Sequence, residues 1–460
     1  MSKPGGIQSG TRETGDDALC ENRREGTWPS CQTTFRPDAV ISMRPALAHN
    51  KLGFVGNHSL ANPRKTQRNH SPRQASMKIL FVTLAFAPGQ VSPYPGVNRY
   101  SVELARALQE EGVDVRIVTS REDSSRQSES WHGMDIFRLA NSKTLVGRMG
   151  VLGDSNLLTF GINLRRNLRL YQDVDLVYTN IPLPLARREA WGRPIVFFIH
   201  HAYRIWRASD LLTVPFGHIY EHRTALVAHR VVVPSEATRR DVIRSHNLPE
   251  RKVVAVHHGV DKKVFRPLGE PGTLGNAGIP TLVYAGLLDA RKGTNDLVPI
   301  FSRVKCECPD VRLLIVGTGP DERTLRKRLR VANLEESVSF FANLSDVELV
   351  ECLNSAGVFL FPSRLEGFGF TVVEAMACAR PVVAYHNATN REVLGNSELL
   401  VPEGDTQAFA TKIIGLLRGS LRAREIGVAA RRRVEQMFDW RSAALGHIDI
   451  FKQACEEGGF

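Results

Sequence analysis

Short apolar runs alternate with longer amphipathic stretches along the chain from residue 77 onward. Runs of this length predict buried strands. In the first half they lie at Lys78–Leu84, Asp114–Val118, Asp175–Tyr178, Ile195–Ile199, Val231–Val233 and Val253–Val256. Stretches with a helical pattern, such as Val97–Glu110 and Ser235–His246, connect them. Apolar strands joined by helices predict a parallel sheet that is covered on both faces.

The same alternation starts again in the second half. The predicted strands there are Thr281–Ala285, Arg312–Val316, Val338–Phe341, Val358–Phe361 and Pro381–Ala384. Between the halves, residues 267–280 hold three prolines and four glycines, a composition typical of a linker. We therefore expect two doubly wound α/β domains, at residues 77–266 and 281–438, followed by an amphipathic helix at 439–460.

Residues 1–76 differ from the rest of the chain. They are rich in Gly, Pro, Ser, Asn and Arg, show no helical or strand period, and carry 11 Lys and Arg against 6 Asp and Glu. Such a segment cannot bury enough apolar surface to order itself, so we expect a disordered basic extension. Because the first predicted strand follows Met77 directly, a mis-assigned start upstream of Met77 is the other interpretation.

The composition, with 42% apolar and 23% charged residues, is that of an ordinary globular enzyme. No apolar run approaches the ~18 residues that would span a bilayer, and the first residues lack the apolar core of a signal peptide. The 7 cysteines are scattered, and Cys306 and Cys308 have no second pair nearby that would complete a zinc site. We therefore expect a cytoplasmic protein that requires neither a metal nor a cofactor.

The most informative stretch runs from Phe359 to Ala384 and reads as strand, glycine turn, helix and strand. A short apolar run ends at Pro362, and Gly367 and Gly369 then form a turn where a ligand can approach the main chain. Good helix formers follow from Phe370. The backbone N–H groups at the start of that helix favour an anion in the turn.

Two carboxylates bracket this turn. Glu366 precedes it and Glu374 lies one helical turn beyond it, with seven residues between them. A carboxylate beside an anion site repels the anion, so its presence makes sense where it accepts hydrogen bonds from neutral hydroxyl groups. A ligand with hydroxyls on both sides of a phosphate is a sugar nucleotide. The alternative for either glutamate alone is a surface charge in a loop or at a helix N-terminus.

This stretch resembles the donor-site signature of the retaining GT-B glycosyltransferases of the group 1 (family 4) type, P-S-x-x-E-G-F-G-x-x-x-x-E-A-M-A-x-G-x-P-V-V. The glycine before x-P-V-V differs, since this chain has Ala379 there. The resemblance covers nearly all of residues 77–460. It implies two facing Rossmann-like domains of GT-B type and a C-terminal helix that returns to the first domain. It also implies a donor site in which Glu366 contacts the sugar and Glu374 the ribose.

A second loop of the resemblance follows the first strand of the second half. It runs from Gly286 to Gly293 and carries Arg291 and Lys292. Cations in a strand-end loop suit a diphosphate, and lysine supplies a compact point charge. The family's common form has an arginine where this chain has Leu287, and we expect Arg291 to replace it. Without the resemblance, a solvated Arg-Lys pair would be the simpler interpretation.

The first domain offers two further positions. His200 and His201 follow the strand Ile195–Ile199. The family has a histidine at this strand end that contacts the donor sugar, and His200 matches its place better, whereas a lone histidine more often makes a structural hydrogen bond. The loop before the first long helix ends in Pro95 and Gly96, where the family has two glycines. Proline has no N–H to donate.

The resemblance thus assigns roles to individual residues. The catalytic residues would be Glu366, Lys292, Arg291 and His200, and the donor-binding residues Glu374, Gly367, Phe368, Gly369, Phe370, Gly286 and Gly96. The chain departs from the family at Pro95, at Leu287 and in the Asn387–Arg391 loop. The family's two glycines are missing from that loop, while Glu392 fits the pattern.

The implied reaction is transfer of a hexose from a UDP- or GDP-linked sugar to a hydroxyl of a sugar or lipid-linked acceptor, with retained anomeric configuration. Such transfer would serve the synthesis of cell-surface polysaccharide, glycolipid or a related glycoconjugate. Two alternatives stay open. One is another GT-B enzyme, such as an epimerase or a phosphorylase, and the other is a non-catalytic subunit that binds a nucleotide sugar.

The net charge of +12 raises the question of anionic partners. A solvated basic tail accounts for part of it, and we expect no nucleic-acid partner. Arg165, Arg166 and Arg169 close a stretch that mixes Leu, Phe and Ile with Arg. This pattern fits an amphipathic helix on the anionic inner face of a membrane, and it fits an ordinary surface helix equally well.

Overall fold

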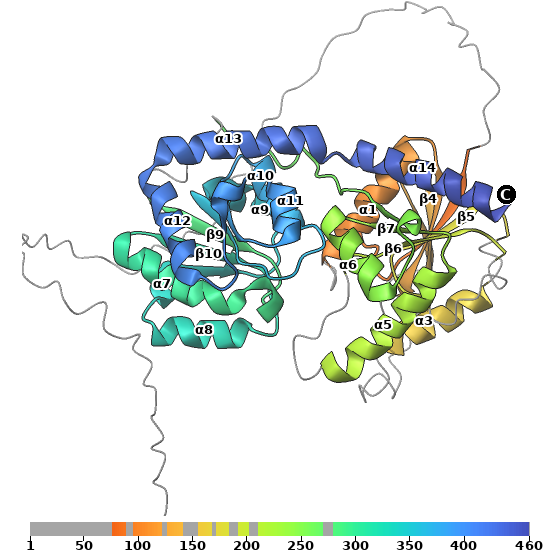
Figure 1. Ribbon diagram of the computed structural model, residues 1–460, viewed down its shortest axis with the longest axis horizontal. Helices are drawn as coiled ribbons and strands as arrows, with labels where there is room; N and C mark the ends of the chain where they lie inside the picture. Colours follow the sequence, from red (N-terminus) through yellow and green to blue (C-terminus); the bar gives the residue numbers. More distant parts are fainter. Residues whose placement is uncertain are drawn as a thin grey trace, which may run out of the picture. The chain divides into compact units, whose positions relative to one another are not determined.

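The computed structural model describes residues 76–88, 95–121, 127–140, 155–167, 172–183, 192–201, 210–269 and 279–459. Residues 1–75, Arg169 and residues 270–278 of the predicted linker lie outside this part of the chain. Within it, the chain forms one sheet of eight strands and one of six, each with helices packed beside it (Figure 1).

The first sheet is built from the first half of the chain. Its strands and the neighbouring helices are β1 (Lys78–Val82), α1 (Pro95–Glu110), β2 (Asp114–Arg121), β3 (Ser128–Trp131), β4 (Met134–Ala140), α3 (Ser155–Arg166), β5 (Leu176–Thr179), β6 (Ile195–Phe198), α5 (Asp210–Val227), β7 (Arg230–Val233), α6 (Glu236–His246) and β8 (Val253–Ala255). The order in the sheet is β3-β4-β2-β1-β5-β6-β7-β8, and the pairs from β4 to β8 are parallel. The predicted parallel sheet is confirmed for these strands.

One hairpin at the edge of this sheet is not in the sequence prediction. Strand β3 pairs antiparallel with β4. The turn between them consists of His132 and Gly133, both with positive φ, at 49° and 82°. Two such residues form the tight turn that matches the twist of a hairpin. Strand β3 is short and exposed, so it lacks the apolar run from which the other strands were predicted.

The second sheet is built from the second half of the chain. Its strands and the helices beside them are β9 (Thr281–Ala285), α7 (Leu297–Glu307), β10 (Arg312–Val316), α8 (Glu322–Val331), β11 (Val338–Phe341), α9 (Asp346–Ser355), β12 (Val358–Phe361), α10 (Phe370–Ala377), β13 (Val382–Tyr385), α11 (Ala388–Leu394), β14 (Leu400–Val401), α12 (Thr406–Arg418) and α13 (Ser420–Met437); the last helix of the chain, α14 (Trp440–Gly458), packs elsewhere. All its strand pairs are parallel, in the order β11-β10-β9-β12-β13-β14. The carboxyl ends of β9 and β12, which are neighbours, therefore meet at one edge of the sheet.

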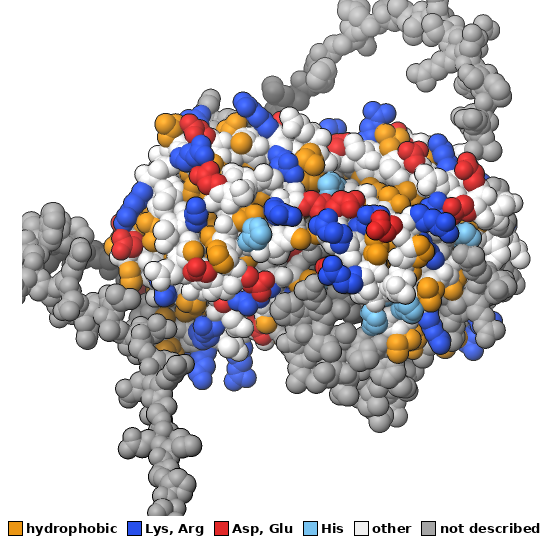
Figure 2. Space-filling model, in the orientation of Figure 1, with side chains coloured by type: hydrophobic (Ala, Val, Ile, Leu, Met, Phe, Trp, Pro, Cys, Tyr) orange, Lys and Arg blue, Asp and Glu red, His pale blue; other side chains and the backbone are white. Residues whose placement is uncertain are grey.

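The surface seen in Figure 2 mixes charges of both signs. Lysine and arginine side chains lie beside aspartate and glutamate side chains across this face. A nucleic-acid-binding surface instead gathers basic residues in one patch or stripe. This face therefore carries no single-sign basic field, despite the net charge of +12.

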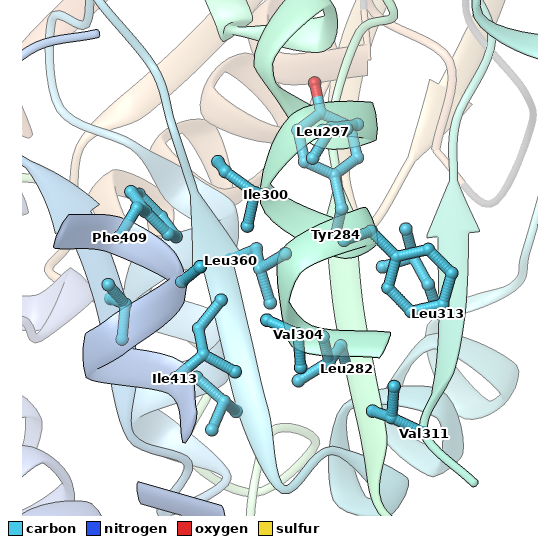
Figure 3. Close-up of a cluster of buried hydrophobic side chains, with 14 of the residues drawn as sticks. Leu282, Tyr284, Leu297, Ile300, Val304, Val311, Leu313, Leu360, Phe409 and Ile413 are labelled. Atoms are coloured by element: carbon cyan, nitrogen blue, oxygen red, sulfur yellow. The ribbon is translucent and has the colours of Figure 1, made fainter. Parts of the chain in front are cut away.

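Each sheet buries apolar side chains on both of its faces. Figure 3 shows one core of the second sheet, where side chains from β9, β10 and β12 meet those of α7 and α12. Leu282, Leu313 and Leu360 project from the strands, and Ile300 and Phe409 from the helices. All five are fully buried, at 0% exposure. A second core, which includes Phe359 of β12 and Val373 of α10, lies on the other face, so a ligand is expected at the strand-end loops.

The last helix belongs to the core of the first sheet. Trp440, Ala444 and Phe451 of α14 are buried in the same cluster as residues of β1 and α1. The backbone at Gly259 packs directly on the start of this helix, since a Cβ on Gly259 would lie 2.2 Å from the backbone N of Trp440. The predicted fold is therefore confirmed, with two doubly wound domains and a C-terminal helix that returns to the first.

Candidate active site

The turn after β12 brings Glu366 and Lys292 together. Lys292 Nζ forms an ion pair with Glu366 Oε1, and Ser363 Oγ donates a hydrogen bond of 3.0 Å to the same oxygen. The Glu366 side chain is 9% exposed and that of Lys292 is 24% exposed. One carboxylate and one ammonium group thus share a half-open position at the carboxyl edge of the second sheet.

A close backbone contact explains why Lys292 reaches this turn. Gly293 follows it with φ 72°, and a Cβ at Gly293 would lie 2.0 Å from the carbonyl O of Pro362. The amide of Arg364 donates to the carbonyl of Arg291 at 2.8 Å. Since glycine is the residue that accepts both the positive φ and the contact, the pair Lys292-Gly293 fixes the loop after β9 against the turn after β12.

Arg291 lies beside Lys292 but has a different partner. Its Nε donates to Asp289 Oδ1 at 3.1 Å, and its side chain is 27% exposed. Asp289 also accepts from the Arg291 amide at 2.8 Å and so caps the short helix Ala290–Lys292. The remaining guanidinium N–H groups lie at the same strand-end loop as Lys292 and are donors that suit an anion.

Helix α10 starts directly after Gly369, which has φ 92°. The side chains of Phe368 and Phe370 pack on the ring of His258, at centroid distances of 4.8 Å in both cases. These two residues therefore present only their backbone to the turn, where the first N–H groups of a helix have no partner within the helix. Main-chain donors, and not aromatic faces, are what this segment offers to a ligand.

Glu374 is buried, at 2% exposure, one turn into α10. Its Oε1 lies 3.3 Å from Nε of Arg99, a residue of α1 in the first domain. Burial raises the pKa of Glu374, the positive charge of Arg99 opposes that rise, and Asp346 adds to it. The guanidinium of Arg99 also pairs with Asp346. Arg99 thus links α1 to two carboxylates of the second domain, a contact that the sequence did not reveal.

His200 lies against the glycine turn from the opposite domain. A Cβ at Gly367 would come within 1.8 Å of the carbonyl O of His200, so only glycine allows this approach. Nε2 of His200 is buried and has no hydrogen-bond partner among the described residues. Burial, with a smaller effect of His201, lowers the pKa of His200 to about 3. The imidazole is therefore neutral, and its ring packs on those of Tyr100 and Phe198, while the backbone carbonyl of His200 contacts the glycine turn.

Two side chains of the Asn387–Arg391 loop, for which the sequence predicted no contact, hold this turn in place. Asn387 Nδ2 donates to the carbonyl of Ser363 at 3.1 Å, and Thr389 Oγ1 donates to that of Glu366 at 3.0 Å. Both lie in the loop where the family's glycines are missing. Asn387 also caps α11, which is the signal that points to it, because asparagine before a helix is a preferred N-cap.

The glycine turn is also bound to helix α6 of the first domain. Ser235 Oγ and Thr238 Oγ1 donate to the carbonyl of Gly367, at 2.9 and 3.2 Å. Glu392 accepts hydrogen bonds from the amides of Glu236 and Ala237, at 2.8 and 2.9 Å. This side chain of the second domain thus caps the N-terminus of α6. Glu392, which follows the loop where the family has two glycines, therefore binds the first domain.

The two remaining glycines of the prediction take different positions. Gly286 lies in the loop after β9, where the neighbouring glycine turn packs on it: a Cβ at Gly317 would lie 2.0 Å from the Gly286 carbonyl. Gly96 is exposed in the first turn of α1, and the space around it is open. Gly286 is thus at the same sheet edge as Lys292, and Gly96 belongs to the helix that carries Arg99.

Helix α3 carries the basic stretch. Its Phe160 and Leu164 are buried in the core of the first sheet, while Arg165 and Arg166 are exposed at its end. Its apolar face is therefore used for packing within the protein. Among the helices that the structure describes, none combines the length and the apolar character needed to cross a bilayer.

Two family models match this chain. Residues 94–264 match the model described as Glycosyltransferase Family 4, and residues 274–433 match the model described as Glycosyl transferases group 1. The chain is 26% identical over 398 residues to D-inositol 3-phosphate glycosyltransferase of Kineococcus radiotolerans, which covers 79% of this chain and 91% of that protein. It is 30% identical over 289 residues to alpha-maltose-1-phosphate synthase of Mycolicibacterium smegmatis, covering 57% of this chain and 74% of that protein.

The fold has close counterparts among solved structures. Anabaena HepE in complex with UDP-glucose superimposes with a TM-score of 0.62 at 18% identity, over 82% of this chain and 100% of that one. A likeness at this identity reports on the fold, which is the GT-B arrangement of two Rossmann-like domains. Taken with the family models and the curated relatives, it follows that the chain belongs to the group 1 glycosyltransferases of the family 4 type.

Proposed function

We propose that this glycosyltransferase moves a hexose from a UDP- or GDP-linked sugar to a hydroxyl of a sugar or lipid-linked acceptor, with retention of configuration. The observation that carries the proposal is the pairing of Lys292 with Glu366 in one half-open turn. The backbone carbonyl of His200 packs on Gly367 of that turn from the first domain. A nucleotide sugar presents a diphosphate and hydroxyl groups side by side, which is what a cation beside a carboxylate can bind together.

Lys292 and the start of α10 would act on the leaving group. Cleavage of the sugar–phosphate bond places negative charge on the diphosphate in the transition state, and fixed positive groups lower the barrier. Lys292, the guanidinium of Arg291 and the first N–H groups after Gly369 supply such charge from one sheet edge. In this proposal transfer requires no metal ion. When the donor enters, Lys292 turns from Glu366 to the phosphate oxygens.

Glu366 would then be free to accept hydrogen bonds from the sugar hydroxyls. Its second hydrogen bond, from Ser363, keeps the carboxylate in place during this exchange. His200 would contact the sugar from the first domain through its unpaired Nε2. Glu374 would hold the ribose, in exchange for its present contact with Arg99. These roles follow the family resemblance, and the contacts described above support them.

The curated relatives suggest which acceptors to test first. One of them is named for D-inositol 3-phosphate and another for the synthesis of alpha-maltose 1-phosphate. Both names point to phosphorylated polyols or sugars, so we propose a small hydroxylated acceptor of this class ahead of a lipid-linked one. Contact with an anionic membrane through Arg165 and Arg166 is a separate proposal, and it would rest on charge alone because the apolar face of α3 is buried.

The test uses the purified full-length chain. UDP- and GDP-hexoses are first compared for thermal stabilisation, and the stabilising donor is then incubated with inositol 3-phosphate, glucose 1-phosphate and lipid-linked sugars. We expect acceptor-dependent release of the nucleoside diphosphate and a product with the donor's anomeric configuration, as measured by proton NMR.

An inverted product would refute retention. Donor binding without turnover with these acceptors would favour the non-catalytic subunit, and donor isomerisation without acceptor would favour an epimerase. Reversible phosphorolysis would favour a phosphorylase.

A further inference from the structure

Helices α5 and α6 bring four ionisable side chains together within the first domain. His218, Glu221 and His222 lie on α5 at spacings of three and four residues, which places them along one side of the helix. His246 is the last residue of α6. It lies about 15 Å along that helix from the end that contacts the glycine turn. The cluster is therefore separate from the donor site.

Three of these side chains have the geometry of metal ligands. One ligand atom each from His218, Glu221 and His246 lies within 4.8 Å of the others. His246 Nε2 is 2.8 Å from Glu221 Oε1. The rings of His218 and His246 stack with centroids 4.6 Å apart, and the ring of His222 is 5.7 Å from that of His246. Tetrahedral coordination at about 2.0–2.1 Å places ligand atoms about 3.4 Å apart. Small side-chain rotations would bring the three ligand atoms to that spacing.

The interior of this cluster is short of hydrogen-bond partners. The side chain of His246 is 0% exposed and that of Glu221 is 6% exposed. Nδ1 of His246 is buried without a hydrogen-bond partner among the described residues. Buried polar atoms are normally paired, and a buried carboxylate normally has a cation or several donors beside it.

We propose that His218, Glu221 and His246 bind one divalent transition-metal ion, for which Zn²⁺ is the best match. Two imidazoles and a carboxylate form a donor set found in zinc sites. Calcium and magnesium take oxygen ligands and do not suit two imidazoles. The ion would join α5 to α6. The set is not apparent from the sequence because its third ligand comes from a different helix, 25 residues beyond Glu221.

The position of the cluster defines the role of the ion. Helix α6 begins at the Glu392 cap and the Gly367 contact, and its other end would be fixed to α5 by the metal. None of the three ligands touches Lys292, Glu366 or the start of α10 in the structure. In this proposal the ion acts apart from the donor site: it raises the stability of the first domain and leaves nucleotide binding to the second domain unchanged.

The experiment starts from full-length protein stripped of metal with EDTA. Titration with Co²⁺ should give visible absorption bands that saturate at one equivalent per chain and disappear when Zn²⁺ displaces the cobalt. Added Zn²⁺ should raise the melting temperature. Affinity for UDP or GDP, measured by calorimetry, should be equal with and without Zn²⁺. The separate variants His246→Gln and Glu221→Gln should each weaken Zn²⁺ binding at least tenfold, whereas the exposed control His132→Asn should bind like the wild type.

Several results would overturn the proposal. The wild-type titration decides it even if a variant fails to fold, because the absence of a saturable cobalt spectrum would exclude the site. Unchanged Zn²⁺ affinity in folded His246→Gln would place the ion elsewhere. Loss of nucleotide binding on removal of the metal would assign the ion to the donor site instead.

Discussion

Ala379 takes a left-handed backbone conformation, with φ 56°, just after α10. Glycine is the residue that adopts this conformation without strain, and it stands here in the family signature. The alanine is fully buried, and the chain packs tightly around it: a Cβ at Gly427 would lie 2.1 Å from the Ala379 carbonyl. A left-handed conformation costs a residue with a Cβ roughly 1–2 kcal/mol. The departure from the signature is therefore a local strain next to the helix that carries Glu374.

Replacing Ala379 with glycine should stabilise the protein. Glycine relieves the backbone strain of the folded protein, and this effect outweighs its greater conformational freedom in the unfolded chain. The free energy of unfolding should therefore rise by about 0.5–1 kcal/mol. Urea unfolding of Ala379→Gly against the wild type measures it. Asn247→Gly is the matched control, because Asn247 also has a positive φ, 50°, at a helix end, and asparagine tolerates it. A lower stability of Ala379→Gly would mean that the lost methyl contacts dominate.

The two glutamates of the signature should differ in their kinetic effects. Glu366→Gln should lower kcat about 10-fold or more, because a hydrogen bond to a charged group is worth about 1.5–3 kcal/mol and the sugar gains positive charge in the transition state. Its affinity for UDP or GDP should stay equal or rise, since Lys292 loses a competing partner. Glu374→Gln should raise the donor KM and weaken nucleotide binding, with a smaller effect on kcat.

The contact between Glu374 and Arg99 supplies the control for this pair. If Glu374 holds the ribose, Arg99→Met removes its present partner without removing the ribose acceptor, and calorimetry should find nucleotide affinity kept. If Glu374 serves only to join the domains, Arg99→Met should reproduce the effect of Glu374→Gln. Nucleotide affinity lost in Glu366→Gln and kept in Glu374→Gln would reverse the two roles.

How far a single residue could be predicted depends on how local its partners are. Glu366 and the glycines beside it form one continuous motif, so the sequence identified them. Arg99 could not be found in this way, because its partners Glu374 and Asp346 lie more than 240 residues away in the chain. Asn387 was passed over because the family has glycine-rich backbone there, while this chain uses side-chain hydrogen bonds.

At the scale of elements, helix α6 is one of the places where the second domain contacts the first. Glu392 of α11 accepts hydrogen bonds from two amides at the start of α6 and from His257 Nε2 at 2.8 Å. A carboxylate at a helix N-terminus is stabilised by the positive end of the helix dipole. Burial alone would raise the pKa of Glu392, but the hydrogen bonds from His257 and the amides of Glu236 and Ala237 hold it below its usual value.

Glu392→Gln should therefore destabilise the contact between α11 and α6. The amide keeps one acceptor and loses the charge, at a cost of about 1–2 kcal/mol in unfolding free energy. A lowered carboxylate pKa contributes stability above pH 4.5, the value of the unfolded group, and loses it as pH falls through the folded pKa. The difference between wild type and variant in urea unfolding should thus be full at pH 7 and shrink in acid. A constant difference at both pH values would contradict the role of the charge.

Elements were predictable wherever burial imposed a period. The strands that are apolar on both faces, such as Val358–Phe361, appear in the structure at the predicted residues. The pair β3 and β4 was missed: β3 has only Trp131 as an apolar residue, and β4 buries Met134, Ile136 and Leu139 between polar residues instead of forming the continuous apolar run of the other strands. Helix α1 begins at Pro95, two residues before the predicted start, because proline is well suited to the first helical position.

At the scale of the whole molecule, buried histidines connect the last helix to the first domain. His447 of α14 donates from Nδ1 to the Ala443 carbonyl at 2.7 Å, which leaves Nε2 to accept from one of the hydroxyls of Tyr100 and Tyr178, at 3.2 and 3.1 Å, while these two hydroxyls also bond each other. The ring of Tyr100 also contacts the rings of His200 and His258. The groups that face these imidazoles are aromatic rings, hydroxyls and carbonyls. Such uncharged surroundings favour the neutral form of the imidazole.

Stability should consequently fall between pH 6.5 and about 4. Burial lowers the pKa of His447 to about 4 and of His200 to about 3, and it lowers that of His258 well below its usual value, with smaller effects of neighbouring histidines on the last two. Above pH 6.5 all three are neutral in both the folded and the unfolded state, and stability is unaffected. Below pH 6.5 these histidines are protonated in the unfolded chain but stay neutral in the folded protein. Each histidine therefore lowers the free energy of unfolding by about 1.4 kcal/mol per pH unit, or by about 2 kcal/mol at pH 5.

Urea unfolding at pH 8, 7, 6 and 5 measures this loss, which should begin below pH 6.5. His447→Gln cannot be protonated in this range and should reduce the slope of stability against pH by one histidine's share, whatever its effect on stability at pH 8. The variant His386→Gln, which removes an imidazole at an exposed position, is the matched control for the substitution itself. A wild-type stability that stays level from pH 7 to pH 5 would mean that the buried histidines accept protons in the folded protein, and the packing of α14 on the first domain would then have to open to admit the charge.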